Sequence, residues 1–312
     1  MSKNYHKPIF SVVIPAFNEE KFLPKCLESL KKQDFKRFEV IVIDNNSTDK
    51  TTEVVKKFKI NLISEKNQGV AFAREKGFRS AKGKIIAFTD ADTILPNNWL
   101  SKIFEEFENN KNLVAFGGSC EFYSGSPLAR LASKFLLPIF LHLDKFFSGG
   151  WNLMGCNMAI KKEALLKIGG FNTNLQLNED VEISYRLREI GRVKLDPKFK
   201  VMTSGRRFRH GLILGLINYT PTTIYRWIFK RFNKFQFFVP QRKEESLVGK
   251  FLLPLFFVFF FSFLLLHFLS PKIIMAKNLT KKEFEKLVLI EKNIKKLIKN
   301  FKFKNEKSFL HF

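Results

Sequence analysis

The stretch Ile85-Ile86-Ala87-Phe88-Thr89-Asp90-Ala91-Asp92 decides how the rest of this chain is interpreted. Its apolar part, residues 85–88, is short and follows Gly83, which is typical of a buried strand. Ligands of α/β sheets lie just beyond the carboxyl ends of strands, where Asp90 and Asp92 stand. Two carboxylates this close repel each other unless a cation binds. A divalent metal that carries phosphates is the expected occupant, because Mg²⁺ prefers one or two carboxylates plus phosphate oxygens. An acidic turn without a metal is the alternative.

Alternating strands and helices precede that stretch. Apolar runs predict strands at 10–14, 39–44 and 60–64, and amphipathic patterns predict helices at 19–32 and 69–81. Repeated βα units imply an α/β fold with a mainly parallel, doubly wound sheet. The chain has neither a G-x-G-x-x-G fingerprint nor a P-loop, so a nucleotide would be held by acids and a metal.

A helix at 99–107 and a strand at 113–118 are predicted next, and after them the pattern is less regular. Helices are predicted at 128–147, 161–168 and 178–189. The helix at 128–147 is apolar with scattered charges, so it is expected to lie either on a membrane or on the domain itself.

The C-terminal third combines an apolar run with excess positive charge. Residues 251–269 lack formal charge if His267 is neutral, and 19 such residues are long enough to span a bilayer. A buried core helix is the alternative. Residues 211–312 carry a net charge of +13, against +12 for residues 1–210. We therefore expect a basic interfacial segment at 211–250, a transmembrane helix, and a Lys-rich amphipathic tail at 270–312.

Partners and compartment follow from the same composition. Basic charge suits an anionic membrane or a nucleic acid, and the apolar run favours the membrane over nucleic acid. Cys26, Cys120 and Cys156 are too far apart for a zinc site and too few for a disulfide framework, which is typical of a reducing cytosol. The first residues lack the apolar stretch of a signal peptide.

Six short motifs occur in an order that is more specific than any of them alone. Together they resemble the family 2 glycosyltransferases of the GT-A fold, over roughly residues 8–210. The resemblance implies a Rossmann-like mixed sheet with a nucleotide-sugar half at 8–120 and an acceptor half at 120–210. The motifs are Ser11-Val-Val-Ile-Pro-Ala-Phe-Asn-Glu-Glu20, Val42-Ile-Asp-Asn-Asn-Ser-Thr-Asp49, Thr89-Asp-Ala-Asp92, Gly155-Cys-Asn-Met-Ala159, Gly169-Gly-Phe171 and Asn178-Glu-Asp180.

The resemblance assigns donor-binding roles to several positions. Asp92 would bind Mg²⁺ or Mn²⁺, and Asp90 would face the ribose. Asp44 would accept a hydrogen bond from the N–H edge of uracil or guanine, although an Asx turn explains it equally well. Arg74 would approach the diphosphate, whereas its residue type alone favours a solvated helix face. The implied nucleotide-sugar positions are Pro15, Ala16, Asn18, Glu19, Asp44, Asn46, Arg74, Asp90 and Ala91.

The resemblance also implies the chemistry. Asp180 would act as general base on the acceptor hydroxyl, and Glu179 would orient it, so that a single displacement inverts the anomeric carbon. The simpler interpretation of these two acids is favourable charge at a helix N-terminus. Arg206 or Arg207 would clamp the diphosphate, with membrane-surface charge as the alternative. The implied acceptor or sugar pocket contains Trp151, Gly155, Asn157, Arg206 and Arg207.

One departure from the family narrows the expectation. Processive synthases carry a Q-x-x-R-W motif, of which this chain keeps only Arg226 and Trp227 after Thr223. A polymer-extruding synthase is therefore disfavoured. We expect a membrane-associated, metal-dependent, inverting hexosyltransferase with its catalytic domain in the cytoplasm, which uses a UDP- or GDP-sugar and a glycan or lipid-linked acceptor.

Three other interpretations stay open at this point. A polyprenyl-phosphate sugar synthase would share the fold and the donor. A non-catalytic, membrane-anchored scaffold would also share the fold, but retention of Asp44, Asp92 and Asp180 argues against it. A nucleotidyltransferase would normally show a Gly-rich basic loop after its first strand, where this chain has Pro15-Ala-Phe-Asn-Glu19.

Overall fold

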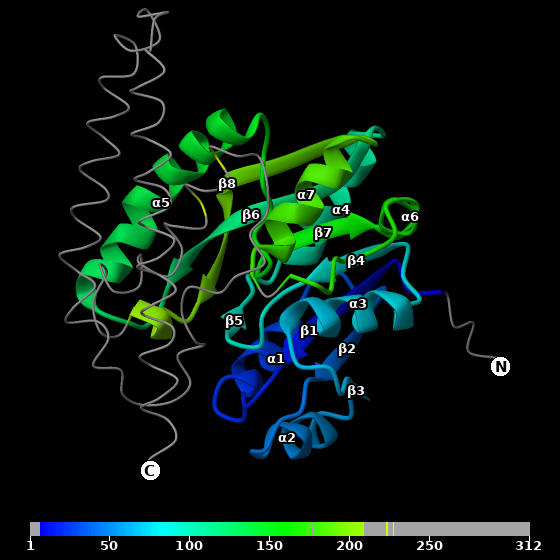
Figure 1. Cartoon of the computed structure of the whole chain (residues 1–312). Helices are drawn as coiled ribbons and strands as arrows, with labels where there is room; N and C mark the ends of the chain where they lie inside the picture. Colours follow the sequence, from blue (N-terminus) through cyan, green and yellow to red (C-terminus); the bar gives the residue numbers. More distant parts are fainter. Residues whose placement is uncertain (1–6, 176, 209–222, 224–226, 228–312) are drawn as a thin grey trace, which may run out of the picture. The chain divides into compact units, whose positions relative to one another are not determined.

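The computed structural model describes residues 7–175, 177–208, 223 and 227. The chain divides into two compact units, residues 1–244 and 245–312, and all the described residues belong to the first. This part is an α/β fold with one mixed sheet of eight strands, in the order β3-β2-β1-β4-β7-β6-β8-β5 (Figure 1). The predicted segments at 211–250, 251–269 and 270–312 lie outside it, apart from two residues. Among the described helices, none has both the length and the apolarity needed to cross a bilayer.

The first half of the sheet is parallel, as the repeated βα pattern predicts. β1 pairs in parallel with β2 and β4, and β2 pairs in parallel with β3. Helix α1 begins four residues later than predicted, because Glu19 and Glu20 belong to the preceding loop and Pro24 stands in the first turn. The elements are β1 Phe10–Ala16, α1 Leu23–Lys31, β2 Phe38–Asp44, α2 Thr51–Lys57, β3 Asn61–Ser64, α3 Val70–Ser80 and β4 Ile85–Phe88.

The second half makes the sheet mixed. β7 runs antiparallel to both β4 and β6, while β6 and β8 are parallel and β5 is antiparallel to β8. β5, β7 and β8 have no counterpart among the strands predicted from the sequence. The elements are β5 Thr93–Ile94, α4 Trp99–Asn109, β6 Leu113–Phe122, α5 Pro127–Ser148, β7 Met158–Lys161, α6 Lys162–Lys167, α7 Glu179–Arg188, β8 Arg192–Thr203 and the short 3₁₀ turn η1 Arg206–Phe208.

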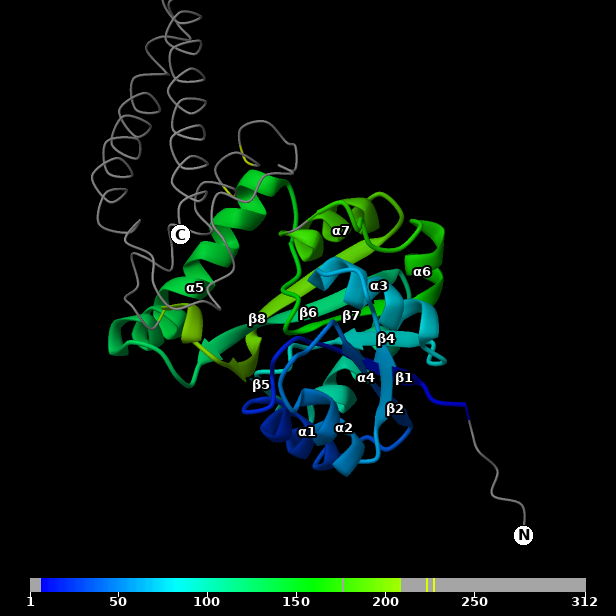
Figure 2. The same ribbon diagram turned by 60° about the horizontal axis from the view of Figure 1, so that its bottom comes forward.

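Two apolar cores cover the two faces of the sheet. Successive side chains of a strand point to opposite faces, so Val12 and Ile14 of β1 join one core while Val13 joins the other. The first core contains apolar residues of α1, α2 and α4, and the second contains those of α3, α6 and α7 (Figures 1 and 2). Helices on both faces bury the apolar strands and leave the strand ends accessible.

Local backbone geometry marks the ends of helices α5 and α7. The Ser126 hydroxyl caps α5 by accepting from the Ala129 N–H, and Gly149 ends it in the left-handed conformation (φ 71°). Helix α7 begins at Glu179, directly after Asn178, which is also left-handed (φ 61°). This turn places the two acids Glu179 and Asp180 in the first turn of the helix.

Candidate active site

The donor side of the site lies where parallel strands end. β1 ends at Ala16, directly opposite Asp44 at the end of β2, and β4 ends at Phe88 beside β1. The chain order reverses between β1 and β4, which lie side by side although two βα units separate them in sequence. Crevices at such points are the usual ligand sites of open α/β sheets. Pro15, Ala16 and the acids after β4 are therefore brought to one edge, as predicted.

The loops that follow β1 and β2 hold each other in place. The Asn18 side-chain oxygen accepts from the Thr48 N–H at 2.8 Å, and the Asn18 N–H donates to the Ser47 hydroxyl at 3.0 Å. Asp44 accepts from the Ser47 N–H at 3.2 Å, three residues on, whereas an Asx turn would use the N–H two residues on. Asn46 donates to the Lys66 carbonyl at 2.6 Å. These bonds form a rigid rim at the predicted nucleotide side.

Asp92 is buried in a cluster of charged groups. Its carboxylate lies 3.0 Å from the Arg206 guanidinium, which also binds both oxygens of Glu19, at 2.8 and 2.6 Å. The Thr203 hydroxyl approaches the same carboxylate at 3.4 Å. Arg206 comes from η1 and Glu19 from the loop after β1, so residues 187 positions apart in sequence meet at this edge. Arg207, its neighbour, is exposed.

Electrostatics at Asp92 suit a cation. Burial raises its pKa to about 6, and the negative charges of Asp90 and Glu19 act in the same direction, while Arg206 opposes them. No cluster of three His, Cys, Asp or Glu side chains among the described residues could hold a metal by itself. One carboxylate supplemented by phosphate oxygens is nevertheless the ligand set that Mg²⁺ usually takes. The residues present therefore fit a divalent metal that arrives with a phosphorylated ligand.

Arg74 joins the donor side to the helix that carries the acids Glu179 and Asp180. Its side chain is only 3% exposed, so the solvated helix face favoured from its residue type is wrong. The guanidinium pairs with Glu179 and, at 2.9 Å, with Asp90. Burial is possible because α3 packs against the core on the α7 side and because Gly155 leaves room. A Cβ atom at Gly155 would overlap the Arg74 guanidinium.

Glu179 is buried beneath Asp180. Burial raises the pKa of Glu179 to about 7, and Asp180 adds to the rise, while the guanidinium of Arg74 opposes it. The partly exposed Asp180 carboxylate accepts from the backbone N–H groups of Gly155 and Val181, each at 2.8 Å. Asp180 is thus held in one orientation by two backbone N–H groups.

Residues 151–155 run along α7 in the opposite direction. The Gly155 N–H meets Asp180, the Leu153 N–H meets the Ser184 hydroxyl at 2.9 Å, and the Trp151 carbonyl accepts from Arg188 at 2.6 Å. Eight helical residues separate Asp180 from Arg188, or about 12 Å. The structure therefore places Trp151 at the far end of α7 from Asp180, with the ammonium of Lys145 4.5 Å from its ring centre.

Asn157 lies inside the fold. It is fully buried, its side-chain oxygen accepts from the Trp99 indole at 2.8 Å, and its amide donates to the carbonyls of Ser119 and Phe199 at 3.0 and 2.9 Å. Both amide hydrogens are used in these contacts. They join β6, β8 and α4 beneath the site, so the contacts of Asn157 are those of a structural residue.

Two residues that touch Asp92 were not anticipated from the sequence. The Tyr123 hydroxyl donates to the Asp92 carbonyl at 3.2 Å, and Thr203 reaches its carboxylate. They lie 31 and 111 residues from Asp92, on the loop after β6 and at the end of β8. The sequence assigned neither of them a role at Asp92, although Thr203 opens the stretch Thr203-Ser-Gly-Arg-Arg207, which resembles a family segment. Their position depends on the pairing of β6 with β8.

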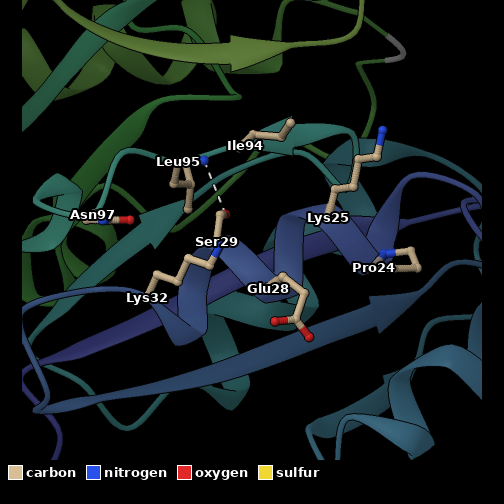
Figure 3. A pocket seen from close by; sticks show the side chains of 8 residues that line it. All are labelled: Pro24, Lys25, Glu28, Ser29, Lys32, Ile94, Leu95 and Asn97. Carbon is tan, nitrogen blue, oxygen red and sulfur yellow. Dashed lines mark hydrogen bonds between the residues drawn. The ribbon is translucent and has the colours of Figure 1, made fainter.

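A shallow hollow between α1 and the segment around β5 lies away from these acids (Figure 3). The Leu95 N–H donates to the Ser29 hydroxyl at 3.1 Å in its wall. None of the predicted site residues lines it, so the hollow does not enlarge the candidate site.

The family comparison covers half of the chain. The sequence profile of the family described as glycosyl transferase family 2 matches residues 11–169. An uncharacterised glycosyltransferase of Haemophilus influenzae is 31% identical over 57% of this chain and 62% of its own length. The glycosyltransferase AglE of Haloferax volcanii is 27% identical over 59% of this chain and 62% of its own. The chain thus spans about three fifths of these two relatives.

Solved structures share the fold. The mannosyltransferase PcManGT from Pyrobaculum calidifontis, in complex with GDP-Man and Mn²⁺, matches 74% of this chain and 68% of its own, with a TM-score of 0.56 and 22% identity. TarS of S. aureus, in complex with UDP-GlcNAc, matches 70% of this chain and 64% of its own, with a TM-score of 0.50 and 20% identity. The mixed α/β sheet of the described residues therefore has GT-A proteins as structural neighbours.

Proposed function

Because this chain belongs to glycosyl transferase family 2, we propose that it transfers a hexosyl group from a UDP- or GDP-linked sugar to an acceptor at a membrane. One observation carries the proposal. Arg74 ties Asp90, on the donor side, to Glu179, which stands beside the oriented carboxylate of Asp180. A donor-binding edge and a base are thus held together in one site.

The donor is proposed to bind at the ends of β1, β2 and β4. Asp44 accepts a hydrogen bond from the base, and a carboxylate suits the N–H edge of uracil or guanine because it only accepts. Asn18, Asn46 and Ala91 form the rim, and Asp90 faces the ribose. The solved neighbours support this choice, since PcManGT was determined with GDP-Man and TarS with UDP-GlcNAc.

Asp92 is the residue that would hold Mg²⁺ or Mn²⁺ together with the diphosphate. When bound, such an ion supplies Lewis-acid stabilisation of the negative charge on the departing diphosphate. Arg206 already contacts Asp92 and Glu19, and it is proposed to turn toward the phosphate oxygens when the donor arrives. Arg207 is proposed to add positive charge from the exposed side.

Asp180 is proposed to remove the proton of the acceptor hydroxyl. The acceptor oxygen forms a bond to the anomeric carbon while the bond from that carbon to the diphosphate breaks, and the proton goes to the Asp180 carboxylate. Attack from the face opposite the leaving group inverts the anomeric carbon. Glu179 orients this base, and Trp151 and Gly155 stay proposals for the acceptor side, whereas Asn157 is buried in the fold.

The acceptor is proposed to be lipid-linked, on the cytoplasmic face of a membrane. The support is the sequence of the C-terminal third, where the uncharged apolar run 251–269 stands between Lys- and Arg-rich segments. The same features support a catalytic domain that works at the membrane surface.

The test uses the full chain in membranes, a panel of UDP- and GDP-sugars, and Mn²⁺. Turnover of one donor should need the metal, be lost in Asp92→Ala, and fall by about 10²- to 10⁴-fold in Asp180→Asn, because general-base catalysis contributes that much. Asp34→Asn is the matched control, since Asp34 is exposed on the loop after α1. Turnover of no donor, together with no metal-dependent nucleotide binding, would contradict the proposal and favour a non-catalytic scaffold.

A further inference from the structure

We propose that one face of helix α5 is the surface by which the catalytic unit docks onto an anionic lipid bilayer. The inference deepens the membrane association of the proposed function by assigning it to a particular surface. Its test needs neither donor nor acceptor, so it is independent of catalytic activity.

Most of the exposed large apolar side chains of the described residues lie on α5, and this observation carries the proposal. Eleven large apolar side chains are exposed among the described residues, and nine of them belong to α5. Phe146 is 78% exposed, and Leu136 and Ile139 are 57% and 58% exposed. The nine are Leu128, Leu131, Phe135, Leu136, Ile139, Phe140, Leu143, Phe146 and Phe147. So large a contiguous apolar surface marks an interaction site in a folded protein.

The arrangement on α5 is two-sided. Leu128, Leu131, Phe135, Ile139 and Leu143 recur at intervals of three and four residues, which places them on one face of the helix. The other side of the helix is buried against the domain through two small side chains and one leucine; these are Ala129, Ser133 and Leu141. The helix is therefore anchored to the fold by one side, and its apolar stripe is exposed on the other.

The positive charge on α5 favours anionic lipid as the partner of its apolar face. Arg130, Lys134 and Lys145 are exposed on α5, whereas its one acid, Asp144, is buried and accepts from Asn152 at 2.7 Å. These cations form a basic border along one flank of the apolar stripe, and such a border matches anionic lipid headgroups above an acyl layer. A second copy of this chain would set like charges against each other, because the same cations would face their equivalents.

Trp227 extends the same face. Its ring stacks on Phe147 with centres 4.8 Å apart, lies 6.1 Å from Phe140, and its indole N–H donates to Asp144 at 2.7 Å. Tryptophan is typical of the interface between headgroups and acyl chains. In the sequence it is preceded by Arg226 and followed within four residues by Lys230 and Arg231, which adds cations that suit anionic lipid.

The proposed surface is connected to the active site at both ends. Helix α5 begins shortly after Tyr123, whose hydroxyl binds the Asp92 carbonyl, and it ends just before the segment 151–155, which orients Asp180. Its 22 residues extend for about 33 Å. A bilayer against α5 would therefore bring a lipid-linked acceptor toward the edge of the domain that holds Asp92 and Asp180.

The test places a fluorescent label on α5 in the full chain, reconstituted into vesicles of phosphatidylglycerol and phosphatidylcholine. A single cysteine is introduced as Ile139→Cys, with Leu166→Cys as the matched control, because Leu166 is an equally exposed apolar residue (54%) on α6. The native cysteines are all buried, so the label goes to the introduced position. Lipids brominated near the headgroup end of the acyl chain serve as the quencher.

We expect the label at position 139 to be quenched by brominated lipid and protected from aqueous iodide, while the label at 166 shows the reverse. A position-139 label that only iodide quenches would overturn the proposal, since the face would then be in water. Protection from both quenchers would also overturn it, because protein would then cover the face.

A second measurement keeps the proposal independent of the label. In vesicles without phosphatidylglycerol, the lipid quenching at 139 should fall, since the basic border would lose its partner. Ile139→Glu together with Phe146→Glu should raise iodide accessibility of a label at position 136 at least about threefold, because two buried charges oppose insertion. Leu166→Glu should leave it unchanged. Equal lipid quenching in anionic and neutral vesicles would contradict the assignment to anionic lipid.

Discussion

Replacing Arg74 with methionine should unfold the domain at a much lower temperature. The side chain is 3% exposed and Glu179 is 7% exposed, so at pH 8, above the Glu179 pKa of about 7, the substitution leaves a carboxylate buried without its partner. Removing one member of a buried ion pair costs about 3–5 kcal/mol. For a domain of about 200 residues, each kcal/mol lowers Tm by about 2–4 °C, so the expected fall is about 6–20 °C.

The matched control is Arg79→Met on the same helix. Arg79 is 50% exposed and pairs with Glu75 at 2.7 Å, four residues earlier. An exposed pair of this kind contributes about 0–1 kcal/mol, so its loss should lower Tm by less than about 4 °C. Methionine replaces an arginine side chain in both variants. The two variants therefore differ mainly in whether the ion pair that is lost is buried or exposed.

Thermal unfolding of the purified full chain, followed by intrinsic fluorescence, measures both variants. The double variant Arg74→Met with Glu179→Gln should recover most of the lost Tm, because no unpaired charge is then buried. Equal losses in Arg74→Met and Arg79→Met would refute the reasoning, as would a double variant less stable than Arg74→Met alone.

Three further outcomes are expected. Gly155→Ala should lower the free energy of unfolding by about 1–3 kcal/mol, because the methyl group of the alanine would overlap the Arg74 guanidinium. An unchanged Tm would contradict this packing. Arg206→Gln should tighten Mn²⁺ binding to the nucleotide-free protein by roughly tenfold, since Asp92 loses a bound cation. Electron paramagnetic resonance titration measures this affinity. Equal affinity in the wild type and the variant would argue against competition between Arg206 and Mn²⁺ for Asp92. Glu179 keeps its proton in the folded state up to a pKa of about 7, above its unfolded value, so its contribution to stability should fall as pH rises from about 4.5 through 7. Tm of the wild type should therefore decline more steeply over that range than Tm of Glu179→Gln, and parallel curves would exclude a raised pKa.

Local sequence predicted the elements that are regular along the chain. The first four strands and α3 lie where the apolar runs and helical periodicity place them, because each buries a continuous or periodic set of side chains. The strands β5, β7 and β8 were missed. β7 is four residues long and begins inside the motif Gly155–Ala159. β8 contains Pro197 and pairs with β6 through a register shift, so neither strand shows a clean period of two.

The sequence by itself determined the family of this protein and predicted the sheet edge at which the donor is proposed to bind. Acids that follow apolar strands in a βα series must meet at one edge, because parallel strands end on the same side of a sheet. Only the tertiary structure decided what those acids contact. Arg74 meets Glu179 across 105 residues and Arg206 meets Glu19 across 187, and such pairs depend on the packing of α3 against α7 and on where β8 ends. The burial of Arg74 has the same origin, since a residue's exposure is set by the elements packed over it and not by its own helix.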